Sequence, residues 1–147
     1  MNEEQLQALY METLAEEGYR PKLDEDNDII FKAEGRTLYI RMYSDDTEYF
    51  QLVLPNFWKI ESEEERELAL IAANHATRVT KVAKVFVTKA NTCASIEMFL
   101  PDPSLFGKVI NRAVAALRNG AEHFAEKMQD LEYTEEDEPS EFGESEE

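Results

Sequence analysis

Residues 62–87 read SEEERELALIAANHATRVTKVAKVFV, and this stretch predicts a capped helix followed directly by an apolar strand. Ser62 and Glu65 have the spacing of a capping box, in which the hydroxyl accepts from the third helical N–H and the glutamate reaches back to the cap. The three glutamates after Ser62 lie at the positive end of the helix dipole, and Arg78 lies near the negative end. We therefore expect the helix to begin directly after Ser62.

Five residues recur along this helix at helical spacing and predict its buried stripe. The predicted stripe consists of Leu68, Ile71, Ala72, His75 and Val79. Alanines at positions 69, 73 and 76 leave little bulk beside it, so the helix can lie close to whatever it covers. From Lys84 to Thr88, β-branched residues alternate with polar ones, which is typical of a half-buried strand.

Length, cysteine content and charge limit the class of protein. A chain of 147 residues fits one domain with a sizeable core. The single Cys93 excludes an internal disulfide. The first residues, MNEEQLQALYMETLAEEGYR, are acidic and amphipathic, which is unlike a secretory or mitochondrial signal, and no apolar run approaches the ~20 residues of a membrane span. We expect a cytoplasmic protein that does not bind membranes.

Acidic residues dominate the charge and concentrate at the end of the chain. The net charge is −17, and residues 132–147 contain nine acidic residues and no basic one. This segment is too poor in apolar residues to offset its ordering entropy, so we expect a single domain over residues 1–131 and an acidic disordered tail over 132–147. An acidic surface argues against binding nucleic acid, which needs clustered Lys and Arg.

The remaining periodicity predicts an α+β domain. Asn2 and Gly18 bound a first helix, and three alternating strands follow, over residues 28–34, 36–43 and 49–54. Residues 19–23 could add a short strand before them. After the helix and strand described above come a strand over 92–100 and a long helix opened by Asp102 and Pro103, in which Gly120 could cause a bend or break. The predicted order is α-β-β-β-α-β-β-α, with three helices against an antiparallel sheet of about five strands.

Two segments of the chain carry the motifs of a known family: EEGYRPKLDEDNDIIFKAEGRTLYIRMYSDD at 16–46 and AANHATRVTKVAKVFV at 72–87. They resemble the bacterial YbjN-like family, whose members are described as sensory-transduction regulators. The shared marks are Gly18-Tyr19, the acidic turn before Ile29, Gly35, Asn74 and Ala83-Lys84-Val85. Where a second asparagine is expected in the helix, this chain has Thr77.

The resemblance covers about residues 3–129 and implies a fold. The family looks like the class I chaperones of type III secretion systems, which share the order of elements predicted above and commonly form dimers. It has no established catalytic residues, so the resemblance assigns none here. Together with the alanine-rich surface of the helix after Ser62, it leads us to expect a homodimer.

Several residue groups could carry chemistry, but we expect none of them to do so. Asp24, Asp26 and Asp28 copy the first ligand positions of an EF-hand, yet Ile29 stands where glycine is needed and Gly35 where the bidentate glutamate should be. His75 and His123 lack metal-ligand spacing, and Cys93 has no predicted base beside it. We expect no metal, no cofactor and no catalytic activity.

The second face of the predicted sheet is unusually aromatic. It carries the candidate partner-binding residues Tyr39, Arg41, Tyr43, Tyr49, Val53, Glu97 and Phe99, with Gln51 among them. Either the helix after Ser62 covers this face within the monomer, or the face is exposed, and an exposed patch of several hundred Å² usually marks a partner or dimer surface.

We therefore expect a noncatalytic protein-binding module of chaperone, adaptor or regulatory type, with a protein or peptide partner. The alternative is a regulator whose acidic tail competes for a basic partner, and an enzyme of unknown class is the third possibility. The sequence names neither the partner nor the pathway.

Overall fold

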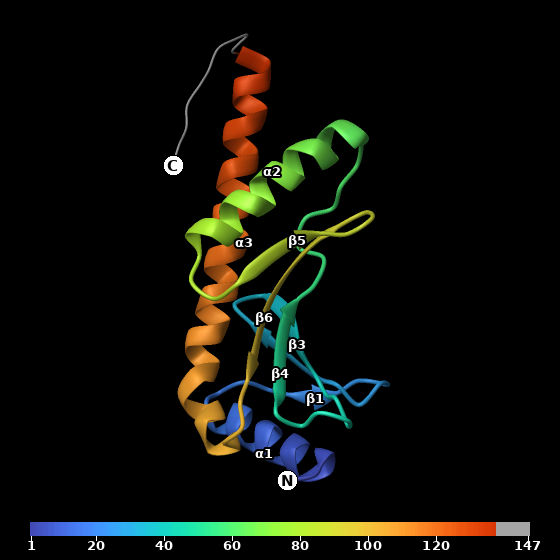
Figure 1. Cartoon of the computed structure of the whole chain (residues 1–147), viewed down its shortest axis with the longest axis vertical. Helices are drawn as coiled ribbons and strands as arrows, with labels where there is room; N and C mark the ends of the chain where they lie inside the picture. Colours follow the sequence, from blue (N-terminus) through green and yellow to red (C-terminus); the bar gives the residue numbers. More distant parts are fainter. Residues whose placement is uncertain (138–147) are drawn as a thin grey trace.

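The computed structural model describes the backbone of residues 1–137 and the side chains of residues 1–132. This part of the chain forms an α+β fold (Figure 1). Its elements are α1 (Glu3–Glu16), β1 (Lys22–Leu23), β2 (Ile29–Ala33), β3 (Arg36–Arg41), β4 (Tyr49–Leu54), α2 (Glu63–Val79), β5 (Lys84–Val87), β6 (Thr92–Phe99), a 3-10 turn (Pro103–Leu105) and α3 (Phe106–Asp137). The predicted order is confirmed, with the additional short strand β1 before the first predicted strand.

All six strands pair antiparallel in one sheet, in the order β1-β2-β3-β4-β6-β5. The first four strands form a meander, and β6 then pairs with β4, so that β5 becomes the edge strand. Because successive side chains in a strand point to opposite faces, the sheet has an inner face toward the helices and an outer face. The sheet has the five predicted strands and a sixth, β1, which is the short strand that residues 19–23 could add.

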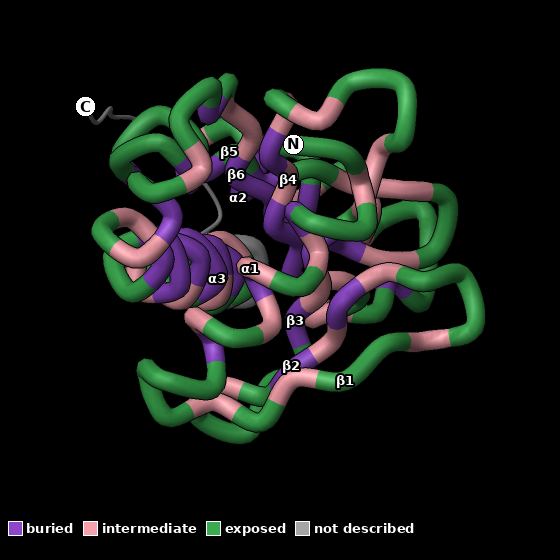
Figure 2. Tube along the Cα trace, turned by 90° about the horizontal axis from the view of Figure 1, so that it is seen from below, coloured by how far each residue is buried: buried purple, intermediate pink, exposed green. Residues whose placement is uncertain are grey.

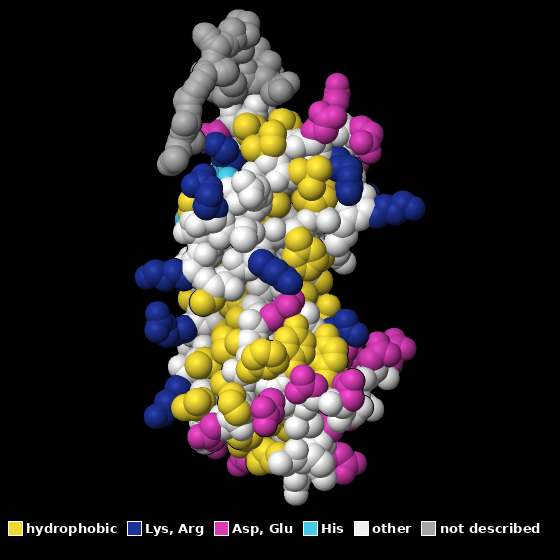
Figure 3. All heavy atoms as spheres, viewed as in Figure 1, with side chains coloured by type: hydrophobic (Ala, Val, Ile, Leu, Met, Phe, Trp, Pro, Cys, Tyr) yellow, Lys and Arg dark blue, Asp and Glu magenta, His cyan; other side chains and the backbone are white. Residues whose placement is uncertain are grey.

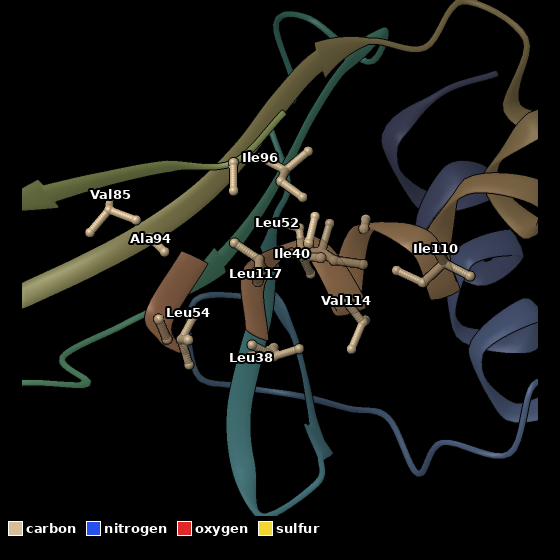
Figure 4. Close-up of a cluster of buried hydrophobic side chains, with 14 of the residues drawn as sticks. Leu38, Ile40, Leu52, Leu54, Val85, Ala94, Ile96, Ile110, Val114 and Leu117 are labelled. Carbon is tan, nitrogen blue, oxygen red and sulfur yellow. The ribbon is translucent and has the colours of Figure 1, made fainter. Parts of the chain in front are cut away.

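The core lies between the inner face of the sheet and α3. Figure 4 shows side chains from β3, β4, β5 and β6 meeting side chains from α3, and Figure 2 shows buried positions running along α3 and the strands beside it. The largest fully buried side chains include Phe50, Phe106, Phe124, Leu14, Ile29, Ile40, Leu52, Ile96, Ile110 and Leu117. α1 closes one end of this core, where Tyr10 stacks on Phe106 with ring centroids 4.1 Å apart.

The start of α2 is built as the sequence predicts, with one difference. The Glu65 N–H donates to the Ser62 hydroxyl at 3.0 Å, which confirms the N-cap. The Glu65 carboxylate, however, accepts from the N–H of Glu61 at 2.6 Å, and its other oxygen accepts from the Trp58 indole at 3.2 Å. Glu65 thus ties the loop before α2 to the first turn of the helix.

The predicted buried stripe of α2 is wrong for its largest members. Ile71 and Val79 are 51% and 43% exposed, while Leu68 and His75 are half-buried at the margin. α2 packs against α3 and β5, and its buried residues are Ala69, Ala72, Ala73 and Ala76. Alanine has no bulk beyond Cβ, so the two helices can approach closely only on this side, and the larger side chains are turned away from the contact.

α3 is one continuous helix through Gly120, so the predicted bend or break is wrong. A Cβ at Gly120 would lie 3.3 Å from Cγ2 of Val85 and 3.6 Å from Cβ of Ala83. Glycine is therefore needed for the close approach of α3 to β5 and does not mark a bend. α3 continues to Asp137, so residues 132–137 of the predicted tail are helical, and the rest of that prediction concerns 138–147, outside the described residues.

None of the helices in the described part of the chain is both long and apolar enough to cross a membrane.

Candidate functional site

The predicted partner-binding residues do share one face of the sheet, its outer face. The pairing register places Tyr39 opposite Val53, Arg41 opposite Gln51, and Gln51 opposite Glu97. Tyr49 pairs with Phe99, and Tyr43 lies two residues beyond the end of β3. Three rows of side chains therefore cross β3, β4 and β6. Figure 3 shows hydrophobic side chains gathered over the lower part of the molecule, in the region of β4 and β6.

The outer face is not covered by α2, which settles the alternative that the sequence left open. α2 packs against α3 and the edge strand β5, and α3 occupies the inner face (Figure 1). Arg41 is exposed, and Tyr39, Tyr43 and Tyr49 are each partly exposed. Phe99 is 74% exposed, an unusual position for a phenylalanine at the end of a central strand.

Aromatic rings form a row across the lower end of the outer face. The Tyr43 and Tyr49 ring centroids are 5.1 Å apart, and the Tyr49 and Phe99 centroids are 6.3 Å apart. The guanidinium carbon of Arg41 lies 5.4 Å from the Tyr43 centroid, within the range of a cation–π contact. The rings therefore support one another, and the exposed Phe99 lies at one end of the row.

Val53 does not belong to the accessible surface, although the sequence predicted it there. Its side chain is only 5% exposed. In the register it lies between Tyr39 and Ser95 in the middle of the sheet. Val53 is therefore part of the packed sheet and is not available to a partner.

Glu97 is the centre of a hydrogen-bond network on the same face. One carboxylate oxygen accepts from Gln51 Nε2 and from the Ser95 hydroxyl, each at 3.0 Å. The other accepts from Lys84 Nζ at 3.1 Å, which also makes an ion pair. The carboxylate thus connects three neighbouring strands, β4, β6 and β5.

The surroundings of Glu97 favour its ionised form. Partial burial on its own would raise the pKa, but hydrogen bonds from Gln51, Tyr49, Lys84 and Ser95 outweigh burial and lower the pKa to about 2. Burial and the hydrogen bond to Glu97 raise the pKa of Tyr49 to about 12. At neutral pH the site therefore holds a fixed carboxylate beside an un-ionised phenol.

The network continues into the aromatic row through Gln51. The Tyr43 hydroxyl donates to Gln51 Oε1 at 2.6 Å, while the amide nitrogen of Gln51 donates to Glu97. Each end of the Gln51 amide therefore has a partner, which fixes the orientation of the side chain. The aromatic rings and polar groups of the outer face are consequently held in one arrangement before anything binds.

Among the described residues, the acidic turn before β2 is where carboxylate oxygens lie close enough together to hold a cation. Oxygens of Asp24, Asp26 and Asp28 lie within 4.8 Å of one another. One Asp24 oxygen accepts from the N–H groups of Asp26 and Asp28 at 2.8 and 3.0 Å, and Asp28 accepts from the N–H of Met42 at 2.8 Å. These bonds give Asp24 and Asp28 a structural role in the turn.

The two histidines and the cysteine that the sequence offered as candidates lie within the packed structure. His123 Nδ1 lies 2.8 Å from the Thr80 hydroxyl and connects α3 to the end of α2. His75 is half-buried on α2. Cys93 is buried, and its sulfur lies 3.5 Å from the backbone nitrogen of Asn56, which donates to it. Within residues 1–132, the hydrogen-bond partners of the Glu97 carboxylate include neither Cys93 nor His123.

Sequence reasoning found the face but missed the polar network. Ser95 and Glu97 are two residues apart on one strand, so their common face could be predicted. The pairing of Glu97 with Gln51 and Lys84 depends on strand order, since β6 inserts between β4 and β5. Alternation within single strands contains no information about that order.

Comparison with protein-family models, curated proteins and solved structures gives no match to this chain. The resemblance to the YbjN-like family therefore stays a prediction based on the motifs quoted above.

Proposed function

We propose that the chain is a noncatalytic protein-binding module of chaperone or adaptor type, and that it binds its partner on the outer face of the sheet. One observation carries the proposal: Phe99 is 74% exposed beside the partly exposed rings of Tyr49 and Tyr43. Aromatic side chains that are left exposed and close together are characteristic of binding surfaces.

The fixed polar groups around these rings also favour binding. Tyr and Arg are enriched among the residues that dominate binding energy, and Arg41 lies against Tyr43. Because Gln51 and Glu97 are already hydrogen-bonded, little side-chain entropy remains to be lost when a partner orders this face. The outer face thus combines apolar area with a preformed pattern of charge.

The same network argues against a catalytic role for Glu97. A general acid or base works best with a pKa near the operating pH, whereas the pKa of Glu97 is lowered to about 2. Its oxygens are already engaged by Gln51, Ser95 and Lys84. A carboxylate in this state can orient a partner, but it is poorly suited to proton transfer at neutral pH.

We also propose that the chain forms a homodimer, although the alanine-rich surface of α2 does not support this. The alanine-rich surface of α2 is buried within the monomer, so it does not form an interface between copies. The outer face of the sheet is the surface that we propose for self-association. Light scattering at micromolar concentration should then give twice the chain mass of 17.0 kDa, and a mass of one chain would exclude the dimer.

The alternative of a regulator that acts through its acidic tail concerns residues 132–147, of which 132–137 are helical and 138–147 lie outside the described part of the chain. It stays a prediction from the sequence.

Affinity capture with matched baits tests the binding surface. The wild type is compared with Phe99→Glu, which places a charge at the exposed end of the aromatic row. Leu70→Glu is the control, because Leu70 is also an exposed large apolar residue, 50% exposed, but lies on α2. We expect a partner retained by the wild type and Leu70→Glu to be lost with Phe99→Glu. A partner retained equally by all three baits would contradict the proposal.

A further inference from the structure

β6 extends beyond the edge strand that pairs with it. β5 pairs with β6 only over residues 92–95, whereas β4 pairs with β6 as far as Phe99. Within the described residues, no strand lies beside Ile96–Phe99 on the side of β5. The second half of β6 is therefore an open sheet edge in an otherwise central strand.

Backbone groups at two positions point toward this open edge. The Leu100 N–H donates to the Glu48 carbonyl at 2.7 Å, on the side of β4. Backbone groups of an antiparallel strand alternate between its two neighbours. Those of Met98 and Ile96 consequently face β4, and those of Glu97 and Phe99 face the open edge.

The outer edge of β5 shows how such groups are protected elsewhere in this fold. There the Thr77 hydroxyl accepts from the Val85 N–H at 2.8 Å and interacts with the Val85 carbonyl at 3.1 Å. Within the described residues, no side chain makes an equivalent bond to the backbone of Glu97 or Phe99. The edge of β5 is therefore closed at Val85, whereas no such bond closes the edge of β6 within the described residues.

A strained turn before β5 interrupts strand pairing at this edge. The Ala83 N–H donates to the Lys81 carbonyl at 2.6 Å, and Val82 between them has a φ of 55°. A β-branched residue rarely adopts positive φ, and such strain often accompanies functional sites. Pairing with β6 accordingly begins only at Lys84, and Lys81 in the turn lies beside the edge without pairing with it.

A groove of about 470 Å³ lies beside the open edge, between β6 and α3. Its floor is apolar and is formed by Ile96 and Met98 of β6 with Val109, Ala113 and Ala116 of α3. The small alanine side chains leave the space open. The groove lies on the inner side of the sheet, so it is distinct from the aromatic outer face.

The rim of the groove is basic although the chain is strongly acidic. Lys108 and Arg112 lie one helical turn apart on α3, and Lys81 lies in the turn before β5. All three are exposed, and none forms an ion pair or a side-chain hydrogen bond within residues 1–132. Figure 3 shows Lys and Arg side chains projecting along the side of the molecule where Figure 1 places α3.

We propose that this edge and groove bind an extended acidic peptide of a partner protein by strand addition. The peptide backbone pairs with the open groups of Glu97 and Phe99, and an apolar side chain packs on the floor beside Met98. Peptide carboxylates lie near Lys108 and Arg112 on the rim. The occupant is acidic because three cations that form no ion pair within residues 1–132 surround the groove in a chain of net charge −17.

Fluorescence anisotropy with the full chain tests the chemistry of the occupant. The probe is a capped, fluorescein-labelled peptide with a Val-Thr-Val centre and two glutamates at each end. A matched probe carries lysines in place of the glutamates, and a third is N-methylated at the central residues, which removes backbone donors. We expect only the unmethylated acidic probe to bind, and its affinity should fall as salt is raised. Equal binding of the lysine or methylated probe, or no binding of the acidic probe up to about 1 mM, would overturn the proposal.

Charge reversal on the rim locates the site. Arg112→Glu should weaken binding of the acidic probe by at least about tenfold, because it places like charges opposite one another. Lys89→Glu changes the net charge equally at an exposed position between β5 and β6, and should alter affinity by less than about twofold. Tyr43→Ala on the outer face should leave this affinity unchanged, which separates the groove from the function proposed above. Equal losses with Arg112→Glu and Lys89→Glu would show general charge attraction and overturn the proposed site.

Discussion

The amide nitrogen of Gln51 on β4 donates to the carboxylate of Glu97 on β6 at 3.0 Å, and the same two residues are direct partners in the pairing register. The bond therefore costs no distortion of the sheet. Through Glu97 it reaches Lys84 on β5, and through the other end of Gln51 it reaches Tyr43. One cross-strand pair thus orients the polar and aromatic parts of the outer face together.

Glu97→Gln should destabilise the fold most near neutral pH. The folded-state pKa of Glu97 is about 2, below the ordinary value of 4.5 for a glutamate, so the ionised form stabilises the folded state above the unfolded pKa. That contribution is lost as the pH falls through the folded pKa. The free-energy difference between wild type and variant, from urea unfolding, should be about 1 to 2 kcal/mol at pH 7, a figure reduced for the partial exposure of Glu97.

The pH dependence provides the control for this prediction. Because other carboxylates titrate in both proteins, only the difference between wild type and Glu97→Gln is informative. This difference should decrease as the pH falls from 4.5 toward 2. A difference that is constant over this range would show that the network does not depend on the charge of Glu97.

Gly120→Val should destabilise the fold by about 1 to 3 kcal/mol, the usual cost of overpacking. A Cβ at this position would already lie 3.3 Å from Cγ2 of Val85. The two methyl groups of the new valine would add further atoms to this contact between α3 and β5. Glu122→Val, at an exposed position of the same helix, controls for the helix propensity of valine. Thermal or urea unfolding of both variants is the measurement. Equal effects of the two substitutions would show that the close approach of α3 to β5 does not require glycine.

Truncation after Leu131 should leave the Tm within a few degrees. The last fully buried side chain of α3 among the described residues is Met128, and Leu131 is only partly buried against the core. The residues removed include the last helical ones, 132–137, so truncation after Asp137 is the matched control. A fall of about ten degrees with the shorter chain would show that the end of α3 packs on the domain.

Local patterns in the sequence predicted most of the fold. The caps at Asn2 and Ser62 and the left-handed Gly18 bound their helices as expected, since each depends on a few neighbouring residues. Alternation along β3, β4 and β6 placed the aromatic residues on one face. These features were predictable because their causes lie within one turn or one strand.

Features that depend on tertiary contacts were missed. Helical spacing alone could not show that α2 buries its alanines and leaves Ile71 exposed, because the closeness of α3 decides which side is buried. The packing role of Gly120 was missed for the same reason, because its neighbour Val85 is remote in sequence. The basic groove unites Lys81 with Arg112 only once β6 lies between β4 and β5.

Tyr43→Ala, with affinity for the captured partner and urea unfolding measured on one protein, tests the proposed binding face most directly. Because α2 leaves the outer face open and Tyr43 is partly exposed, we expect binding to weaken by about 1 to 3 kcal/mol while stability changes much less. A loss of about 3 to 5 kcal/mol of stability, as for a fully buried aromatic residue, together with unchanged affinity would contradict the account.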